Sequence, residues 1–390
     1  MSSSLKDVAL RAGVSPRTVS NVVNGSAAVA EPTRLRVQEA IDELGYRPNL
    51  AARSLRAGRT GIIGLAIPEL HSPYFAELAG LLVDEARRRS WTVIIDQTLG
   101  DAEAERRLLT GDGGRVMDGL VISPWALKAR DLTATPRALP VVLLGERSPD
   151  GLADRVAVDN VAAADEATTH LLECGRRRIA AIGLQPHLEN GTADQRAEGY
   201  RRALRRAGVE PRPAWERPVA SLHRSDGARA MADLLDGDGT GGGGDAGGRD
   251  GTGRSGGGPR DGDGTGRSGG GPRDGDGTGR SGGGRGGGGD AVPDAVFAFS
   301  DELALGALHT ARARGVRVPE DLAIVGFDDI EDGRFSFPGL TTVSPDKHQI
   351  AARALQCLAD RIYSPRNELP AHDLTIPHRL IVRGSTVPGA

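Results

Sequence analysis

Residues 4–24, SLKDVALRAGVSPRTVSNVVN, predict two short helices joined by a tight turn. Ser4 followed by Asp7 fits a capping box that opens the first helix, and the apolar residues after it recur every three or four positions. A glycine supplies the turn, after which Ser15 and Pro16 fit the cap and the first position of the second helix. The pattern is typical of a helix-turn-helix, whose second helix enters the major groove of DNA, although any small helical hairpin with a solvated polar face would share it.

The second of these helices has two different faces. Its valines are spaced to pack on the first helix. The other side carries side chains that can hydrogen-bond to base edges: Arg17, Ser20, Asn21 and Asn24. Residues 1–60 hold nine lysines and arginines against five acidic residues, although the whole chain has a net charge of only −3. This local surplus of positive charge favours a polyanionic partner.

A third helix is expected from Pro32 to Leu44, where Gly45 ends it, with an apolar set that includes Leu35. Three helices within 45 residues predict a small independent head. Residues 49–57 are expected to form one more helix, which is too short to be stable alone.

From residue 61 the pattern changes to short apolar runs that alternate with helices. Such runs are typical of parallel strands covered on both faces, so the sequence predicts an α/β fold built from βαβ units. The expected strands are Ile62–Ile67, Val93–Asp96, Gly119–Ser123, Val141–Gly145, Ile179–Gly183, Ala295–Ser300 and Ala323–Phe327. The expected helices include Tyr74–Arg89, Ala162–Cys174, Gln195–Ala207 and Asp226–Leu235.

Three segments carry a resemblance to a known family. DVALRAGVSPRTVSNVVN, ELGYRPN and AARSL resemble the DNA-binding head and hinge of the lactose-repressor/galactose-repressor family of bacterial transcription regulators. The resemblance implies a helix-turn-helix head at 1–48, a hinge helix and linker at 49–60, and an effector-binding and dimerising body at 61–390. The body is expected to resemble a periplasmic sugar-binding protein, with lobe one at about 61–157 and 347–373 and lobe two at about 158–346 and 374–390.

The resemblance also implies which residues contact DNA. In the family the hinge helix folds on the operator beside its twin, and a leucine from each wedges into the minor groove; Leu55 holds that position here, although it could also be a core leucine of an ordinary helix. Asn21 stands where arginine or histidine is common, which favours an altered half-site because asparagine pairs with adenine. The residues expected to contact DNA are Leu5, Ser15, Pro16, Arg17, Thr18, Ser20, Asn21, Asn24, Thr33, Tyr46, Arg47, Asn49, Arg53 and Leu55.

Polar residues also stand at the ends of several expected strands, where open α/β sheets bind their ligands. An arginine and a carboxylate on opposite sides of a cleft suit the hydroxyl groups of a sugar. Matching the family motifs places the following residues in an effector cleft: Phe75, Ser123, Arg196, Leu222, Ser300 and Asp328.

Each of these assignments has a plainer alternative. Phe75 could be ordinary packing, and Arg196 could form a surface salt bridge. His223 could replace Leu222 at a position where the family often has an aromatic. The neighbouring Asp301 and Asp329 are expected to be helix N-caps.

Residues 236–290 form a glycine-rich insert that cannot build a core. They contain 29 glycines, a single alanine as the only hydrophobic residue, and a 13-residue period that starts at Arg260 and again at Arg273. A GxGxxG match at 237–242 does not sit between a strand and a helix, and the DGDGTG repeats lack the glutamate of a calcium loop. The insert is therefore expected to be a disordered connection within lobe two.

Two cysteines, Cys174 and Cys357, are far apart and have no CxxC spacing, so buried free thiols in a reducing cytosol are expected, with a disulfide as the alternative. The first residues include no apolar segment like that of a signal peptide, and no apolar run approaches the roughly 18 residues that span a bilayer. The sequence therefore predicts a cytoplasmic protein without a membrane partner.

Head and body together predict a homodimeric repressor that binds a palindromic operator and is controlled by a small-molecule effector, with a sugar as the expected class. The alternative is a two-lobed solute-binding protein without a gene-regulatory role. An enzyme is not expected, because the sequence has no HExxH or Walker A motif and its eight histidines are scattered. No cofactor and no metal site are expected for the same reason.

Overall fold

The computed structural model describes residues 3–24, 27–46, 59–110, 117–127, 131, 139–145, 153–188, 191–237, 292–364 and 370–389. The expected hinge helix at 49–57 and all but the first two residues of the insert lie outside these ranges. The same is true of four residues expected to contact DNA: Arg47, Asn49, Arg53 and Leu55.

The head consists of α1 (Leu5–Ala12), α2 (Pro16–Asn24) and α3 (Glu31–Leu44). The predicted capping box is present: the backbone N–H of Asp7 donates to Ser4 Oγ, and the Asp7 carboxylate accepts from the Ser4 N–H at 2.8 Å. Gly13 ends α1 with a φ of 64°, a left-handed conformation that glycine adopts without strain. Leu35 does not join the core as expected, because 51% of it is exposed. The core of the head is Val8, Ala9, Ala12, Val19, Val37 and Ala40.

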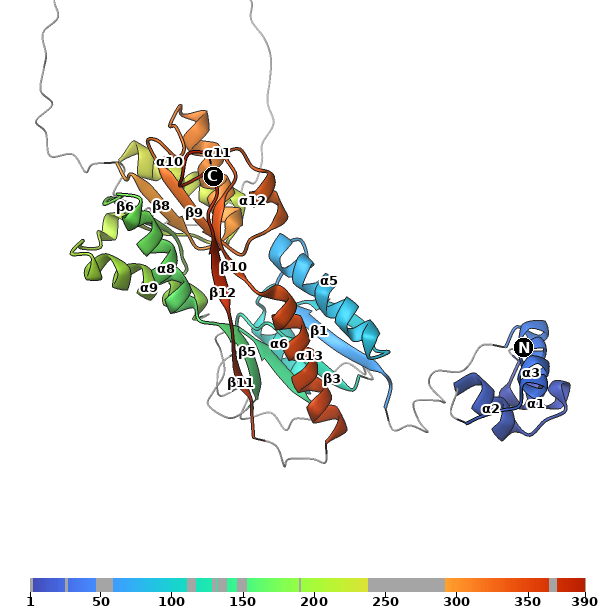
Figure 1. Cartoon of the computed structure of the whole chain (residues 1–390). Coiled ribbons are helices and arrows are strands. Elements are labelled where there is room, and N and C mark those ends of the chain that lie inside the picture. Colours follow the sequence, from blue (N-terminus) through green and yellow to red (C-terminus); the bar gives the residue numbers. More distant parts are fainter. Residues whose placement is uncertain are drawn as a thin grey trace, which may run out of the picture.

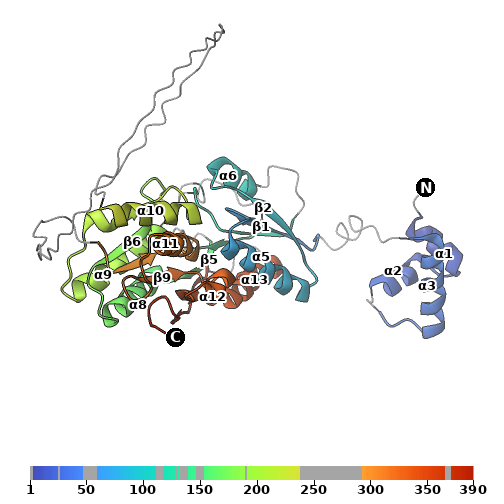
Figure 2. The same cartoon turned by 90° about the horizontal axis from the view of Figure 1, so that it is seen from above.

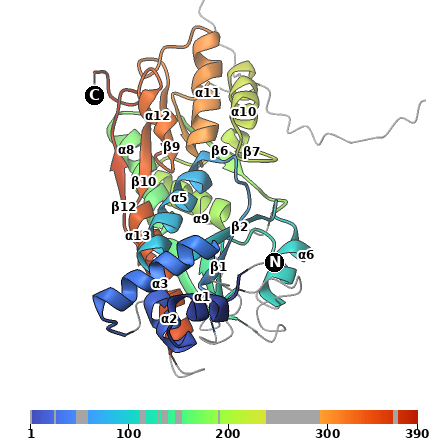
Figure 3. The same ribbon diagram turned by 90° about the vertical axis from the view of Figure 1, so that its right-hand side faces the viewer.

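Lobe one is a six-stranded parallel sheet in the order β11-β5-β4-β3-β1-β2. Helices α5 and α13 pack side by side on one face and α6 covers the other (Figures 2 and 3). The strands are β1 (Ile62–Ile67), β2 (Thr92–Gln97), β3 (Gly119–Ile122), β4 (Val141–Leu144), β5 (Asp154–Val158) and β11 (Asp373–Ile376). The helices are α5 (Pro73–Arg88), α6 (Ala102–Thr110) and α13 (Lys347–Tyr363).

Lobe two has a second six-stranded sheet, ordered β12-β10-β9-β8-β6-β7, in which only β12 is antiparallel to its neighbour. The helix pair α8 and α9 lies on one face and the pair α10 and α11 on the other (Figure 2). The strands are β6 (Ile179–Leu184), β7 (Glu216–Pro218), β8 (Ala295–Ala298), β9 (Ala323–Phe327), β10 (Thr341–Pro345) and β12 (His378–Ile381). The helices are α8 (Asn160–Glu173), α9 (Thr192–Arg206), η1 (Pro213–Trp215), α10 (Arg224–Asp236), α11 (Asp301–Ala313) and α12 (Glu331–Phe335).

The chain passes between the lobes at Asp159, Asp346 and Pro377 (Figure 1). Two of these residues are helix N-caps: the Asp159 side chain accepts from the N–H of Ala162, and the Asp346 side chain from that of Gln349, both at 2.9 Å. The backbone N–H of Asp346 also donates to the carbonyl of Pro377 at 3.1 Å. Two of the three connections are thus tied together at the junction about which the lobes would move.

The predicted fold class, a helical head and two α/β lobes with mostly parallel sheets, is confirmed. All seven expected strands are present. The five that were not expected, β5, β7, β10, β11 and β12, have polar residues or prolines in place of a continuous apolar run.

Both cysteines are free thiols, and Cys357 is buried as expected, whereas Cys174 is only half-buried. Among the helices in the described ranges, none has both the length and the hydropathy needed for a bilayer crossing.

Candidate functional site

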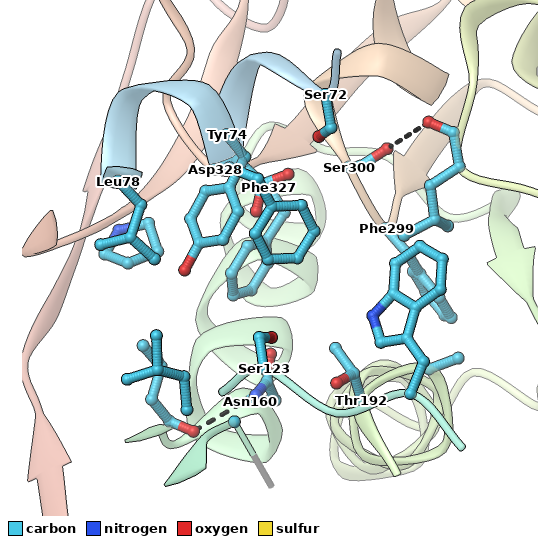
Figure 4. A pocket seen from close by; sticks show the side chains of 18 of the residues that line it. Ser72, Tyr74, Leu78, Ser123, Asn160, Thr192, Phe299, Ser300, Phe327 and Asp328 are labelled. Atoms are coloured by element: carbon cyan, nitrogen blue, oxygen red, sulfur yellow. Dashed lines mark hydrogen bonds between the residues drawn. The ribbon is translucent and has the colours of Figure 1, made fainter. Parts of the chain in front are cut away.

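A cavity lies between the lobes, where the carboxyl ends of strands from both sheets meet (Figure 4). All six residues expected in the effector cleft line it. Lobe one contributes Phe75 and Ser123, and lobe two contributes Arg196, Leu222, Ser300 and Asp328. The structure therefore brings together residues that span more than 250 positions of sequence, and their role in ligand binding stays a prediction.

Arg196 is a buried cation on α9 that turns its guanidinium into the cavity. Its Nε donates to Asn160 Oδ1 at 2.7 Å, and Nη1 donates to the carbonyl of Phe299. The guanidinium stacks 3.5 Å from the ring centroid of Phe327, and Nη2 lies 4.0 Å from Asp328 Oδ1. Three groups thus fix its orientation, and the plainer alternative of a surface salt bridge is wrong because Arg196 is only 8% exposed.

Asp328 follows β9 with a φ of 114°, a backbone conformation that non-glycine residues rarely adopt and that is common at functional sites. Its backbone is held in place because the carbonyl accepts from Lys347 Nζ at 3.0 Å and the N–H donates to Val343 at 2.8 Å. Burial raises the pKa of the Asp328 carboxyl to about 7, although Arg196 and Lys347 oppose the shift. Near neutral pH the group can therefore either accept or donate a hydrogen bond.

Neither neighbouring aspartate is the helix N-cap that the sequence suggested. The cap of α11 is Ser300, whose Oγ accepts from the N–H of Leu303 at 3.2 Å. Asp301 is fully buried and accepts from the N–H of Ile330 at 2.9 Å, and burial together with the nearby Asp328 raises its pKa well above the ordinary value.

Asp329 instead forms an ion pair with Arg383 at 2.6 Å and accepts from Ser344 Oγ at 2.9 Å. Burial opposes its ionisation, but these two partners hold the pKa of Asp329 below its usual value. Asp301 and Asp329 therefore support the strained turn around Asp328.

One wall of the cavity is aromatic. The rings of Phe75 and Trp125 meet edge to face with centroids 6.2 Å apart, and Tyr74 packs against Phe75 at 5.2 Å. Leu222 is aliphatic, so these rings and those of Phe299 and Phe327 supply the aromatic part of the cavity lining (Figure 4).

Sequence reasoning missed several lining residues. Trp125 stands only two positions after Ser123 at the end of β3, so its place in the chain could have identified it. Polar lining residues that the sequence analysis did not single out include Asn160, Gln185, Thr192, Glu69, His71 and Glu302.

In the described ranges, two groups of side chains have metal-ligand chemistry. Asp154, Cys357 and His372 meet inside lobe one. There Asp154 is already paired with both Nε and Nη2 of Arg361, at 2.9 and 2.8 Å, and this contact holds its pKa down against burial. This group is therefore structural. The other group, Glu69, His71 and His223, lies at the cavity.

The head presents the N-terminal end of α2 to solvent. Ser15 caps this helix, since its Oγ accepts from the N–H of Thr18 at 3.1 Å, and Ser15, Pro16 and Arg17 are exposed. Partial exposure is found for Thr18, Ser20, Asn21 and Thr33, and for Leu5 and Tyr46, which also pack against the core of the head. For Asn24 the structure describes only the backbone, which ends α2.

Comparisons with known proteins agree with this architecture. Residues 4–49 match the profile of bacterial regulatory proteins of the lacI family, and residues 60–238 match periplasmic binding proteins and the sugar-binding domain of the LacI family. Residues 278–386 match a periplasmic binding protein-like domain. A solved structure assigned to the LacI family, from Sanguibacter keddieii, is 36% identical with a TM-score of 0.65, covering 84% of this chain and 99% of its own. This chain belongs to the LacI family of transcription regulators.

More distant LacI-family proteins extend the match to nearly the whole chain. The HTH-type transcriptional repressor PurR of Haemophilus influenzae is 28% identical over 384 residues, 98% of each chain. A complex of the transcriptional regulator CelR with cellobiose is 27% identical with a TM-score of 0.63, covering 98% of this chain and 99% of its own. LacI-family members are DNA-binding regulators and not enzymes, so the solute-binding alternative without a regulatory role is wrong for this chain.

Proposed function

We propose that this regulator is a repressor that binds a palindromic operator as a homodimer and is controlled by a sugar bound between its lobes. The observation that carries the proposal is the buried pair of Arg196 and Asp328 beside an aromatic wall in the interlobe cavity. A guanidinium and a carboxyl bind neighbouring hydroxyl groups, and the aromatic rings offer a surface to the apolar face of a sugar ring. The CelR–cellobiose complex supports this class of ligand.

Exposed apolar residues on both lobes support a homodimer. Phe335 and Phe337, at the end of α12 and just beyond it, are 76% and 79% exposed. In lobe one, Ile94 and Ile95 are 41% and 38% exposed on β2, which lies at the edge of its sheet. Such side chains are costly in a monomer and are typical of protein interfaces.

The operator would be bound by two heads at once. One head offers one recognition helix, so a two-fold symmetric dimer reads two half-sites of inverted sequence. The segment 49–57 is too short to form a stable helix alone and would fold on the DNA beside its twin. A ligand that favours one arrangement of the lobes would change the spacing of these segments, and by linkage the DNA would change ligand affinity by the same factor.

The test begins with a thermal-shift screen of the purified protein against sugars and nucleosides, followed by sedimentation on a palindromic operator with and without the ligand found. We expect one dimer per operator and an operator affinity that the sugar lowers. The Phe335→Ser, Phe337→Ser double variant should dissociate to monomers. A wild-type monomer on DNA would rule out the homodimer, and a shift with nucleosides alone would rule out the sugar.

The recognition residues can be tested on the same operator. Arg17→Ala should lose about 1 to 3 kcal/mol and relax the base preference at one position, whereas Arg47→Ala should weaken all sequences alike because a phosphate contact reads no sequence. Equal changes of specificity in both variants would contradict these roles.

A further inference from the structure

Three side chains with metal-ligand chemistry meet at the interlobe cavity, outside the Arg196–Asp328 pair. Glu69 and His71 follow β1 in lobe one, and His223 immediately precedes α10 in lobe two. Glu69 Oε2 lies 2.9 Å from His223 Nε2 and 3.6 Å from His71 Nε2, and the three ligand atoms are all within 4.8 Å of one another. The cluster therefore joins the two lobes through side chains alone.

The hydrogen bonds of His223 determine which of its ring nitrogens carries a proton. Ser221 Oγ donates its single proton to Asp226 Oδ2 at 2.6 Å. The same Oγ lies 2.9 Å from His223 Nδ1, so it must accept there and Nδ1 must carry the hydrogen. In the neutral imidazole, Nε2 is then a bare lone pair.

This lone pair points at a carboxylate oxygen. Two acceptors 2.9 Å apart repel each other unless a cation lies between them or the ring takes up a second proton. Only 14% of the Glu69 side chain is exposed, and within the described ranges its ion-pairing partners are these two histidines. A carboxylate this well shielded from water is stabilised by a nearby positive charge.

We propose that Glu69, His71 and His223 bind a divalent transition metal, Zn²⁺ being the ion that fits best. Two imidazoles and one carboxylate are a common ligand set for zinc with one coordination position left open. Bonds of about 2.0 to 2.2 Å in a tetrahedral site place neighbouring ligand atoms about 3.3 Å apart, between the two distances found here. The chain of Asp226 and Ser221 behind His223 is the kind of outer contact that orients a metal-binding imidazole.

The ion would connect the lobes directly. Since Glu69 and His71 belong to one lobe and His223 to the other, the full ligand set exists only when the lobes are in the present arrangement. A metal that binds this arrangement better than any other shifts the equilibrium toward it. The open position would be filled by water or by an oxygen of a molecule in the cavity, so the inference does not depend on which effector binds.

The test uses the full-length protein without a histidine tag. Metal is first removed with EDTA and dialysis. Zn²⁺ is then titrated into the protein, and its binding is measured by calorimetry. We expect one ion per chain with a low-micromolar or tighter Kd, and a Co²⁺ complex with the visible absorption of tetrahedral coordination. Glu69→Gln, His71→Ala and His223→Ala should each weaken binding at least tenfold. Ser221→Ala should weaken it less than these but measurably, because it acts through His223.

His187→Ala is the matched control, because His187 lies exposed in a turn of lobe two, outside the cluster, and should leave binding unchanged. Thermal melts of the metal-free proteins show whether each variant is folded. Tight binding that survives in all three ligand variants would mean that the ion sits elsewhere. No binding by the wild type would mean that a proton, and not a metal, holds His223 to Glu69. Either result overturns the proposal.

Discussion

The guanidinium of Arg196 and the carboxyl of Asp328 lie 4.0 Å apart at the edge of the lobe-two sheet, and both are largely buried. The distance is too long for a direct hydrogen bond, so no hydrogen bond between the two groups has to break before a ligand bridges them. Burying the guanidinium beside this carboxyl is costly to the ligand-free protein, and a ligand that bridges the two groups would recover part of that cost.

Asp328→Ala is therefore expected to abolish the response to the effector while ligand-free operator binding stays within about twofold. Removing one partner of a buried charge pair costs about 2 to 5 kcal/mol of binding. Calorimetry with the identified ligand and operator titrations measure the two quantities. Leu55→Ala serves as the control with the reverse pattern: it is expected to weaken operator binding and to leave ligand affinity unchanged. Loss of both activities in Asp328→Ala would mean that the residue is needed for folding.

The pKa of Asp328 predicts how stability changes with pH. Because the folded protein holds this proton up to about pH 7 and the unfolded chain releases it near 3.8, the contribution of the group is intact at low pH. It is lost progressively as the pH rises from about 4 through about 7, by on the order of 2 to 4 kcal/mol. Asp328→Asn cannot ionise, so its stability relative to wild type should rise over this interval. Urea unfolding of the two ligand-free proteins at pH 5, 6, 7 and 8 tests this, and parallel pH profiles would contradict it.

The head could be predicted closely because its signals are local. The capping box of Ser4 and Asp7, Pro16 at the start of α2 and Gly45 after α3 each concern residues within one turn. The strands found from sequence were those with continuous apolar runs. Short segments such as DRVAV and TTVSP became strands only because neighbouring strands in the folded sheets pair with them.

Only part of the cavity lining could be predicted from the sequence, because its residues come from distant positions of the chain. Arg196 and Asp328 were identified through family motifs. No local pattern connects Glu69 with His223, which are 154 positions apart and meet only when the lobes meet, so the expectation of scattered histidines missed their cluster.

Glu105 positions the loop that carries Trp125 into the cavity. This fully buried carboxylate on α6 accepts from the N–H groups of Trp125, Ala126 and Leu127 at 2.8, 3.0 and 2.9 Å. Glu105→Ala leaves these donors without their acceptor, at about 1 to 3 kcal/mol each where they stay dry. We expect at least tenfold weaker ligand binding and a changed Trp125 fluorescence spectrum.

The matched control is Glu103→Ala on the same helix. Glu103 forms an exposed salt bridge with Arg106 and should change neither quantity, because such pairs contribute little. If both variants bind ligand like wild type, the loop does not need Glu105.

A pair of glycines lets α10 and α11 approach closely. A Cβ on Gly306 would lie 2.0 Å from the carbonyl oxygen of Arg224, and one on Gly227 would lie 2.1 Å from that of Leu303. Gly306→Ala should therefore destabilise lobe two by on the order of 2 to 3 kcal/mol or more, since the helix backbones must separate. Gly80→Ala on α5 is the control: nothing lies within 4 Å of its new Cβ, so the helix should gain about 0.5 to 1 kcal/mol. Chemical denaturation measures both, and a Gly306→Ala variant as stable as wild type would mean that the helices can shift apart freely.

Replacing residues 238–288 by a four-residue Gly/Ser link should leave operator affinity and ligand response within about threefold of wild type. The segments on either side have their own contacts: Asp236 is paired with Arg314 at 3.0 Å, and Asp294 accepts from the N–H of Arg178 at 2.9 Å. Neither contact involves the replaced residues 238–288, which have no apolar anchor of their own. Because the cost of closing a loop grows with the logarithm of its length, shortening it from about 55 to about 8 residues should stabilise lobe two by roughly 2 kcal/mol. Operator titrations and urea unfolding of the shortened protein measure these effects. A tenfold change in operator affinity, or a loss of stability, would show that the repeats interact with the DNA, the cavity or the lobe.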